Sequence, residues 1–342
     1  MDKTSIRKSN HVEIVLNKRV DYQKSTGLER FSFLHNALPE INFSEIDTKV
    51  RFLSHTFSAP IMVSSMTGGF KYGEKINSML ARFCEERSIP LGIGSQRQAI
   101  ENSKFRGSFT IIRKVARSIF VIANIGAVQV ARGLSKEVVT NLIDMVEANA
   151  IAVHLNSLQE FIQPEGERQF SGVLRGIEKL VKQSGVPVVV KETGAGISSD
   201  VARKLINAGV AAIDISGSGG TSWAAVETLR SREKRLGLKF WDWGISTADS
   251  LVQVNSLTER SKIALISSGG IRDGIDVAKS IALGADMCSA AQPFLKALSR
   301  GGVAGLNREL DFWIEELKGV MFLTGNKNIE KLKREKLVKV KD

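Results

Sequence analysis

The sequence predicts an α/β protein, a (β/α)8 barrel with an N-terminal extension and a long loop after its sixth strand. Eight short apolar runs recur along the chain, at intervals close to the length of one strand and one helix. Each run is apolar over most of its length, which indicates burial on both faces, as in parallel strands covered by helices. The eight units span about 230 residues, near the ~250 residues of a typical barrel.

The eight predicted strands end in small or polar residues, as the strands of a barrel do at its functional end. They cover residues 59–65, 90–95, 119–124, 150–156, 186–192, 211–216, 263–268 and 286–291. An open, doubly wound sheet is the alternative. That fold usually carries a GxGxxG motif after its first strand, and none occurs there.

Three of the intervening stretches have the apolar spacing of amphipathic helices. The first covers residues 135–149, with Ser135 as its N-cap. The second covers residues 198–208, with Ser199 as its N-cap and Gly209 as its stop signal. The third covers residues 274–283. We expect these helices to cover the outside of the barrel.

One interval is far longer than the others and places residues 217–247 after the sixth strand. This segment begins with glycines and holds Trp223, Trp241 and Trp243, so we expect it to cover an active site. The chain therefore divides into three parts. They are an N-terminal extension (1–58), the barrel (59–325) and a basic C-terminal tail (326–342).

Composition excludes several classes of protein. The chain has 342 residues, of which 43% are hydrophobic and 25% charged, as in ordinary globular proteins. No apolar stretch follows the basic residues of positions 1–10, and no apolar run is long enough to span a membrane, so we expect a cytoplasmic protein without a membrane partner. Two cysteines are too few for a disulfide scaffold or a cysteine-rich metal site, and four histidines are too few for a histidine-rich metal site.

The net charge of +12 favours an anionic partner, which could be nucleic acid, an anionic membrane surface or a phosphorylated small molecule. Part of the excess lies at the C-terminus, which we interpret as a solvated tail. Its basic residues are Lys331, Lys333, Arg334, Lys336, Lys339 and Lys341. No basic run is interleaved with aromatic residues, which argues against nucleic acid.

Polar side chains gather at the carboxyl ends of the predicted strands, where a barrel carries its chemistry. In strand order, the residues at these ends, with the small and apolar ones among them included, are Ser65, Met66, Thr67; Ser95, Gln96, Arg97; Asn124; His154, Asn156, Gln159, Glu160; Lys191, Glu192; Ser216; Ser268, Gly269, Gly270, Arg272; and Ala291, Gln292. His154 and Asn156 lie two apart on one strand and so face the same side. We expect this pair to serve a site rather than the core.

Two of these strand ends suggest a phosphate and a flavin ring. Ser268–Gly274 follows the seventh strand and opens a helix, so its backbone N–H groups and Arg272 can bind a phosphate; a tight turn is the alternative. Lys191 ends an apolar strand, where a buried ammonium group needs an anionic partner. A flavin ring that becomes negative on reduction would serve. The alternatives are a Schiff base and a salt bridge to Glu192 or to a neighbouring strand.

A series of motifs covers nearly the whole chain. They are RKSNH (7–11), SSMTGG (64–69), GSQR (94–97), NIGA (124–127), HLNSLQE (154–160), PEG (164–166), VKETGAGIS (190–198), SGSGGTSW (216–223), WGIST (243–247), SSGGIRDG (267–274) and MFLTG (321–325). In this order they resemble the type 2 isopentenyl diphosphate isomerases, which depend on FMN. The sequence departs from the family pattern at Ser246, where proline is expected, and at Gln292, where arginine or glycine is common.

The resemblance implies an enzyme that interconverts isopentenyl and dimethylallyl diphosphate with magnesium and reduced FMN, without net redox change. NADPH or another reductant would reduce the flavin, and the chain would form a homo-oligomer, a tetramer or octamer. By matching position it assigns FMN to Ser65, Met66, Thr67, Ser95, Asn124, Lys191, Ser216, Thr221, Gly270, Ile271, Arg272, Ala291 and Gln292. It assigns the substrate to Arg7, Lys8, Ser95, Gln96, Arg97, Asn156 and Gln159, and magnesium to Glu160.

The expected chemistry is protonation and deprotonation of an allylic system, with reduced FMN stabilising the positive charge. Gln159 and His154 are the candidate catalytic side chains, and the choice between them stays open. A flavin hydroxy-acid oxidase would need a histidine near the sixth and seventh strands, but none follows His154. A nucleotide dehydrogenase of the inosine type would need a cysteine in residues 217–247, which contain none.

Overall fold

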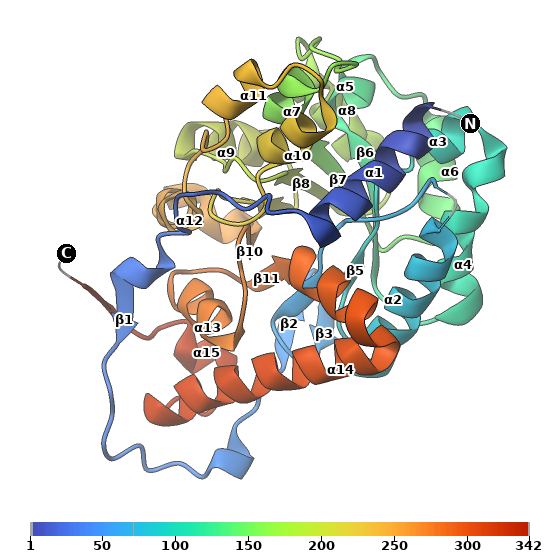
Figure 1. Ribbon diagram of the computed structural model, residues 1–342. Helices are drawn as coiled ribbons and strands as arrows, with labels where there is room; N and C mark the ends of the chain where they lie inside the picture. The colour runs from blue at the N-terminus through green and yellow to red at the C-terminus, as the bar shows by residue number, and fades with distance from the viewer. Residues whose placement is uncertain (1–2, 71, 341–342) are drawn as a thin grey trace.

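The chain folds into a closed barrel of eight parallel strands, in the order β10-β11-β4-β5-β6-β7-β8-β9 (Figure 1). The computed structural model describes residues 3–70 and 72–340. The strands are β4 (Ile61–Val63), β5 (Leu91–Gly92), β6 (Val121–Gly126), β7 (Ala150–Leu155), β8 (Val188–Glu192), β9 (Ala212–Asp214), β10 (Ala264–Ser268) and β11 (Met287–Ala290). The predicted (β/α)8 barrel is confirmed, and each of its strands lies where an apolar run predicted one.

Helices surround this barrel and bury the outer faces of its strands. They are α2 (Gly73–Arg87), α3 (Arg97–Glu101), α4 (Gly107–Val115), α5 (Ala127–Ala131), α6 (Lys136–Asp144), α7 (Ser157–Ile162), α8 (Val173–Gln183), α9 (Ser199–Asn207), α12 (Thr247–Asn255), α13 (Gly274–Ala282) and α14 (Gln292–Leu323). Short 3-10 turns lie at Ser103–Phe105 and Thr258–Lys262.

The predicted start and stop residues of two helices agree only partly with the structure. Ser135 caps α6 by accepting a hydrogen bond from the N–H of Val138 at 3.2 Å, as predicted, but the helix ends at Asp144 rather than Asn149. The backbone of Glu147, with φ of 45°, is incompatible with a continued helix. In α9 the cap is Ser198, not Ser199, and Gly209 follows the helix with φ of 85° as its stop signal requires.

The segment after β9 is helical and lies at the carboxyl end of the barrel. It contains α10 (Trp223–Arg230) and α11 (Arg235–Lys239). Of its three tryptophans, Trp223 alone faces the main cavity, while Trp243 is exposed. The expected cover over the site is therefore provided by α10 and by the glycines that precede it.

The N-terminal extension reaches both ends of the barrel. Helix α1 (Lys3–Asn17) packs on α10 and α14 at the carboxyl end, across the front of the molecule in Figure 1. The hairpin of β2 (Val50–Phe52) and β3 (His55–Phe57) lies at the other end, where Phe57 packs against Phe120 just before β6, with ring centroids 5.5 Å apart. Between them lie β1 (Phe31–Phe33) and two 3-10 turns, Leu28–Arg30 and Phe43–Glu45.

The basic C-terminal segment folds back onto the barrel. It forms α15 (Ile329–Leu332), whose two terminal residues are buried, and β12 (Leu337–Lys339), which pairs antiparallel with β1. Lys333 forms an ion pair with Asp286. The interpretation as a solvated tail is therefore wrong for residues 326–340, because the buried side chains of Ile329 and Leu332 anchor this segment to the barrel. Lys341 and Asp342 lie outside the described residues. None of the described helices is long and apolar enough to cross a bilayer.

We expect Leu332→Ala to lower the free energy of unfolding by about 2–5 kcal/mol, because the side chain is fully buried where α15 meets α13. Urea unfolding followed by circular dichroism measures this. The matched control is Val338→Ala on β12, which is 43% exposed and should change the value by about 0.5 kcal/mol or less. Equal stability of wild type and Leu332→Ala would contradict docking of the tail.

Candidate active site

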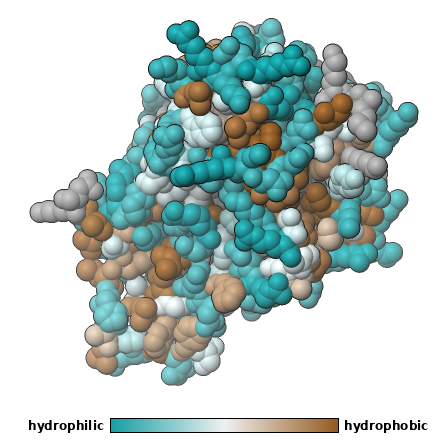
Figure 2. Space-filling model, in the orientation of Figure 1, coloured by the Kyte–Doolittle hydropathy of each residue, from teal (hydrophilic) through white to brown (hydrophobic). Residues whose placement is uncertain are grey.

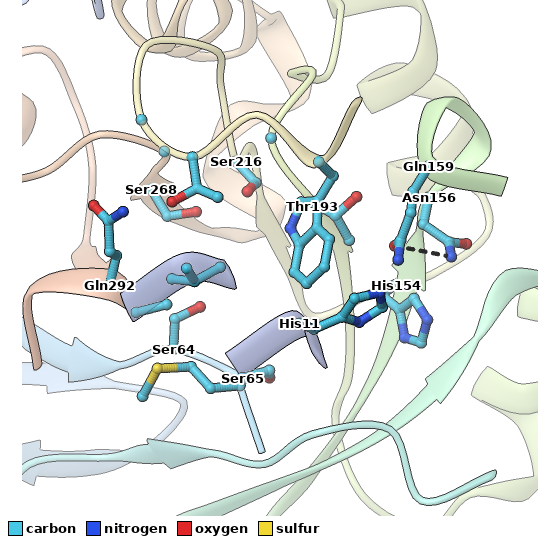
Figure 3. A pocket seen from close by; sticks show the side chains of 18 of the residues that line it. His11, Ser64, Ser65, His154, Asn156, Gln159, Thr193, Ser216, Ser268 and Gln292 are labelled. Carbon is cyan, nitrogen blue, oxygen red and sulfur yellow. Dashed lines mark hydrogen bonds between the residues drawn. The ribbon is translucent and has the colours of Figure 1, made fainter. Parts of the chain in front are cut away.

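A cavity of about 680 Å³ opens at the carboxyl end of the barrel (Figure 3). Loops after the strands form its floor and walls, and α1 with residues 21–25 forms its roof. The cavity brings together all the residues that the sequence assigned to FMN. It also brings together Arg7, Lys8, Arg97, His154, Asn156, Gln159 and Glu160.

Gln96 is the one predicted site residue that the structure does not bring to the cavity. Its side chain is fully buried and donates to the carbonyl of Leu142 at 2.9 Å. Its Oε1 accepts the N–H of Asn124 at 3.1 Å. Gln96 therefore bridges β6 and α6 inside the protein. The prediction that it binds substrate is wrong, because the side chains on either side of it face the cavity and Gln96 faces away.

Glycine-rich loops after β9 and β10 pack so closely that side chains are excluded. A Cβ atom on Gly220 would lie 2.3 Å from the backbone nitrogen of Gly270, and one on Gly270 would lie 2.4 Å from Thr26. Residues 20–22 run across these loops, with the N–H of Tyr22 donating to Gly220 at 2.8 Å. The backbone N–H groups of these loops make a setting suited to phosphate. The first N–H groups of α13 do not contribute, because Gly274 donates to Glu316 and Asp276 donates to Asp273, each at 2.7 Å.

The floor of the cavity fits a flavin. The amide Nε2 of Gln292 is buried and has no hydrogen-bond partner among the described residues, which indicates that a ligand atom completes it. Lys191 lies on β8 and donates to the carbonyl oxygen of Glu192 at 2.6 Å. Lys191 and Glu192 do not form the alternative side-chain salt bridge, because the Glu192 carboxylate accepts the N–H groups of residues 193–195 instead.

His154 is a neutral side chain on the floor. Its Nδ1 lies 2.7 Å from Oδ1 of Asn124, whose amide nitrogen donates to the carbonyl of Ile93 at 2.9 Å. Because that second bond fixes the orientation of the amide, Nδ1 of His154 carries the proton. Burial, together with the charges of Lys191 and Lys8, lowers the pKa of His154 to about 3. His154 therefore orients neighbours and does not supply positive charge near neutral pH.

Cations gather on the side of the cavity opposite the glycine loops. Lys8 of α1 donates to the carbonyls of Gly68 and Ser95 at 2.8 and 2.9 Å, which anchors the helix over its own barrel. Arg7 lies 3.9 Å from Glu165, and Arg97 pairs with Glu167 at 3.0 Å. A diphosphate entering here would meet all three cations.

Glu160 stands beside this cluster and is held from two directions. Its Oε1 accepts from the amide of Asn156 at 3.0 Å, and its Oε2 accepts the N–H of Glu167 at 2.7 Å. Within residues 3–70 and 72–340 no cluster of three histidine, cysteine or acidic side chains could hold a metal alone. One carboxylate with diphosphate oxygens is, however, a common magnesium site.

Comparison with known proteins decides the family. The chain is 44% identical to an isopentenyl-diphosphate delta-isomerase of Pyrococcus furiosus, over 98% of this chain and 87% of that protein. It is 45% identical to one of Chlorobaculum parvum, over 96% of each. The chain belongs to the isopentenyl-diphosphate delta-isomerase family. Residues 127–339 also match the model of the FMN-dependent dehydrogenase family, which supports the FMN-dependent type 2 class.

Solved structures share the fold of this isomerase family member. A putative lactate oxidase of Pediococcus acidilactici has a TM-score of 0.71 at 17% identity, covering 98% of this chain and 95% of that one. A flavocytochrome b2 variant has a TM-score of 0.70 at 19% identity, covering 96% of this chain and 82% of that one. At these identities the likeness concerns the barrel alone.

Glu227 is a site residue that the sequence interpretation missed. Its side chain on α10 is completely buried, 2.9 Å from Nε2 of His11 and 2.8 Å from Nε of Arg230. Gln159 donates to it at 3.0 Å, and Gln163, with its amide oriented to suit its neighbours, donates at 3.1 Å. A lone acid in the apolar run AAVETL was the available signal. In this isomerase fold Glu227 orients Gln159 and ties α1 to the wall.

Glu227 should make stability depend on pH. Burial alone would raise the pKa of Glu227, but the hydrogen bond and charge of His11 and the charge of Arg230 lower it to about 2. A lowered folded-state pKa contributes stability above the ordinary value of 4.5, and this contribution is lost as the pH falls toward 2. Between about pH 6 and pH 3 we expect wild type to lose about 2 kcal/mol more than Glu227→Gln.

Urea unfolding at both pH values measures that difference, with the exposed Glu13→Gln on α1 as the control. Glu13→Gln should follow wild type. Parallel losses in wild type and Glu227→Gln would show that the Glu227 carboxylate is not held in its ionised form.

Proposed function

We propose that the chain interconverts isopentenyl diphosphate and dimethylallyl diphosphate, with reduced FMN and magnesium bound in the main cavity. One observation carries the proposal: a single cavity joins a floor with the residues suited to a flavin to three cations, Arg7, Lys8 and Arg97, that lie beside Glu160. The membership in the isomerase family supports the same reaction.

FMN would lie between the floor of the barrel and the roof of α1. Lys191, Gln292 and Asn124 would meet its ring system, while the loops at Thr221 and Gly270 would receive its phosphate. The remaining residues assigned to it line the same cavity: Ser65, Met66, Thr67, Ser95, Ser216, Ile271, Arg272 and Ala291. When bound, reduced FMN supplies electron density beside the substrate alkene and a ring nitrogen that can exchange a proton.

The diphosphate would lie at the other side, held by Arg7, Lys8 and Arg97. Glu160 would share a magnesium ion with the diphosphate oxygens, because a hard divalent cation prefers such ligands. Ser95 and Asn156 would complete the contacts to substrate. With the charged end fixed in this way, the apolar isopentenyl group is directed toward the floor, where His154 and Gln159 lie (Figure 3).

Gln159 and His154 would position the alkene and the protons that move. Neither supplies a charge, since Gln159 does not titrate and the pKa of His154 is lowered to about 3 by burial and by Lys191 and Lys8. Gln159 is oriented by the ionised Glu227, and the Asn156 amide lies 3.5 Å from its Oε1. The residues therefore exclude water and hold geometry around a reacting alkene.

Several features of its cellular setting belong to the same proposal. We infer a cytoplasmic homo-oligomer, a tetramer or octamer, whose FMN is reduced by NADPH or another reductant, without nucleic-acid or membrane partners. Exposed apolar side chains around the β1–β12 ribbon support self-association: Leu34, Leu38, Leu323, Val338 and Val340. Figure 2 shows apolar surface at the lower left, over the segment between β1 and β2 in Figure 1.

The deciding experiment is an anaerobic assay of the purified chain with isopentenyl diphosphate, magnesium and reduced FMN. We expect dimethylallyl diphosphate to form, and its formation to require the reduced flavin. A chain that retains FMN but produces no dimethylallyl diphosphate would contradict the proposal. Oxygen consumption with lactate would instead favour a hydroxy-acid oxidase.

Glu160→Gln should raise the magnesium concentration needed for half-maximal rate by about tenfold or more, because it removes the carboxylate that lines this wall of the cavity. FMN absorbance should stay the same. Glu178→Gln, on the exposed face of α8, is the matched control and should leave the magnesium requirement unchanged. An unchanged requirement in Glu160→Gln would refute the metal role.

Deleting residues 1–9 should lower kcat/KM for isopentenyl diphosphate by about a hundredfold or more, since two charge-assisted contacts of ~1.5–3 kcal/mol each are lost. Met1 and Asp2 lie outside the described residues, so Arg7→Ala with Lys8→Ala is the narrower variant. Lys18→Ala, exposed after the end of α1, is the control. Full activity of the truncated chain would leave Arg97 and the loops as the phosphate site.

A further inference from the structure

Three titratable side chains lie in one row across neighbouring strands of the barrel. In the ladder register His154 of β7 pairs with Lys191 of β8, and Lys191 pairs with Asp214 of β9. The first two line the cavity, whereas Asp214 does not line it and is 1% exposed. Neither the motifs nor the proposed function uses Asp214, although a carboxylate in a barrel interior is costly without partners.

Serine side chains of two further strands hold the Asp214 carboxylate. Ser268 of β10 donates from Oγ at 2.5 Å, and Ser289 of β11 donates at 3.4 Å. The N–H of Ser216 contributes a third bond at 3.3 Å. All three serines also line the cavity, so Asp214 supports the floor from below.

The charges along this row are unequal. His154 is neutral, because burial and the charges of Lys191 and Lys8 lower its pKa to about 3. Lys191 is then the one cation of the row, and Asp214 is its neighbouring acid. Burial raises the pKa of Asp214, while the charge of Lys191 and the Ser268 hydroxyl oppose that rise and favour the carboxylate.

We propose that Asp214 is a positioning residue that limits how much positive charge Lys191 presents to the flavin ring. The inference rests on the FMN site proposed above. Without Asp214, the charge of Lys191 would be less compensated in a low-dielectric floor, and Lys191 would bind the negatively charged, reduced ring too tightly. With Asp214 in place the reduced ring keeps its electron density available to the substrate.

The experiment is a reductive titration of the FMN-loaded protein against a reference dye, without substrate. Asp214→Asn keeps the shape of the side chain and its acceptor oxygen but removes the charge. We expect reduced FMN to gain about tenfold in affinity relative to oxidised FMN, which is a rise of ~30 mV in the two-electron potential. Lys191→Met should shift the potential in the opposite direction.

Two comparisons separate this role from a structural one. In the Lys191→Met background Asp214→Asn should produce a clearly smaller shift, because burial without the Lys191 charge favours the uncharged acid and leaves little charge to remove. Asp286→Asn removes a half-buried, paired carboxylate at the opposite end of β11 and should weaken stability without moving the potential. If Asp214→Asn does not fold, Ser268→Ala tests the same idea, since loss of its hydrogen bond favours the uncharged acid and should also raise the potential.

An unchanged flavin potential in Asp214→Asn would overturn the inference. If that variant does not fold, an unchanged potential in Ser268→Ala would do so. Equal shifts caused by Asp214→Asn in wild type and in Lys191→Met would also overturn it. These outcomes differ from failure of the proposed function. If the wild-type chain retains no FMN, the proposed flavin site itself is wrong. If the wild type binds FMN but Asp214→Asn does not change the flavin potential, the flavin site stands and only the role of Asp214 is wrong.

Discussion

A carboxylate that is removed from water must be matched by donors or positive charge, and the partners of Glu227 come from separate parts of the chain. His11 comes from α1, Arg230 from α10 itself, and Gln159 from α7. The free energy of leaving such a group unpaired is several kcal/mol, so the three segments are held in one arrangement. The roof of the cavity therefore depends on a buried charge, while the barrel below depends on apolar packing.

The difference between a roof held by a buried charge and a barrel held by apolar packing explains which features could be predicted from sequence. The barrel strands are continuous apolar runs, and a run such as Val188–Val190 can only be buried, whatever its neighbours are. The same holds for residues after strand ends, since the closed barrel brings every strand end to one opening. Positions such as Lys191, Asn124 and Gln292 thus follow from topology together with the resemblance to a family.

The features that were missed depend on side-chain direction or on contacts between distant segments. Gln96 stands between two cavity residues, and only the local turn decides that it faces α6 instead. Leu332 and Ile329 were hidden in a basic segment because charge dominates its composition, although two apolar residues suffice to anchor it. Glu227 belongs to an otherwise apolar helix, and its partners are 216 and 68 positions away along the chain for His11 and Gln159.

The departure from the family pattern at Ser246 shows how local chemistry preserves a helix start. Ser246 is the N-cap of α12, where its hydroxyl accepts the N–H of Asp249 at 3.2 Å and donates to the Asp249 carboxylate at 2.6 Å. Asp249 in turn pairs with Arg30 at 2.5 Å, which ties α12 to the segment that runs from α1 to β1. A proline at this position would fix the backbone without these bonds. The serine thus retains the loop geometry while linking it to the N-terminal extension that covers the cavity.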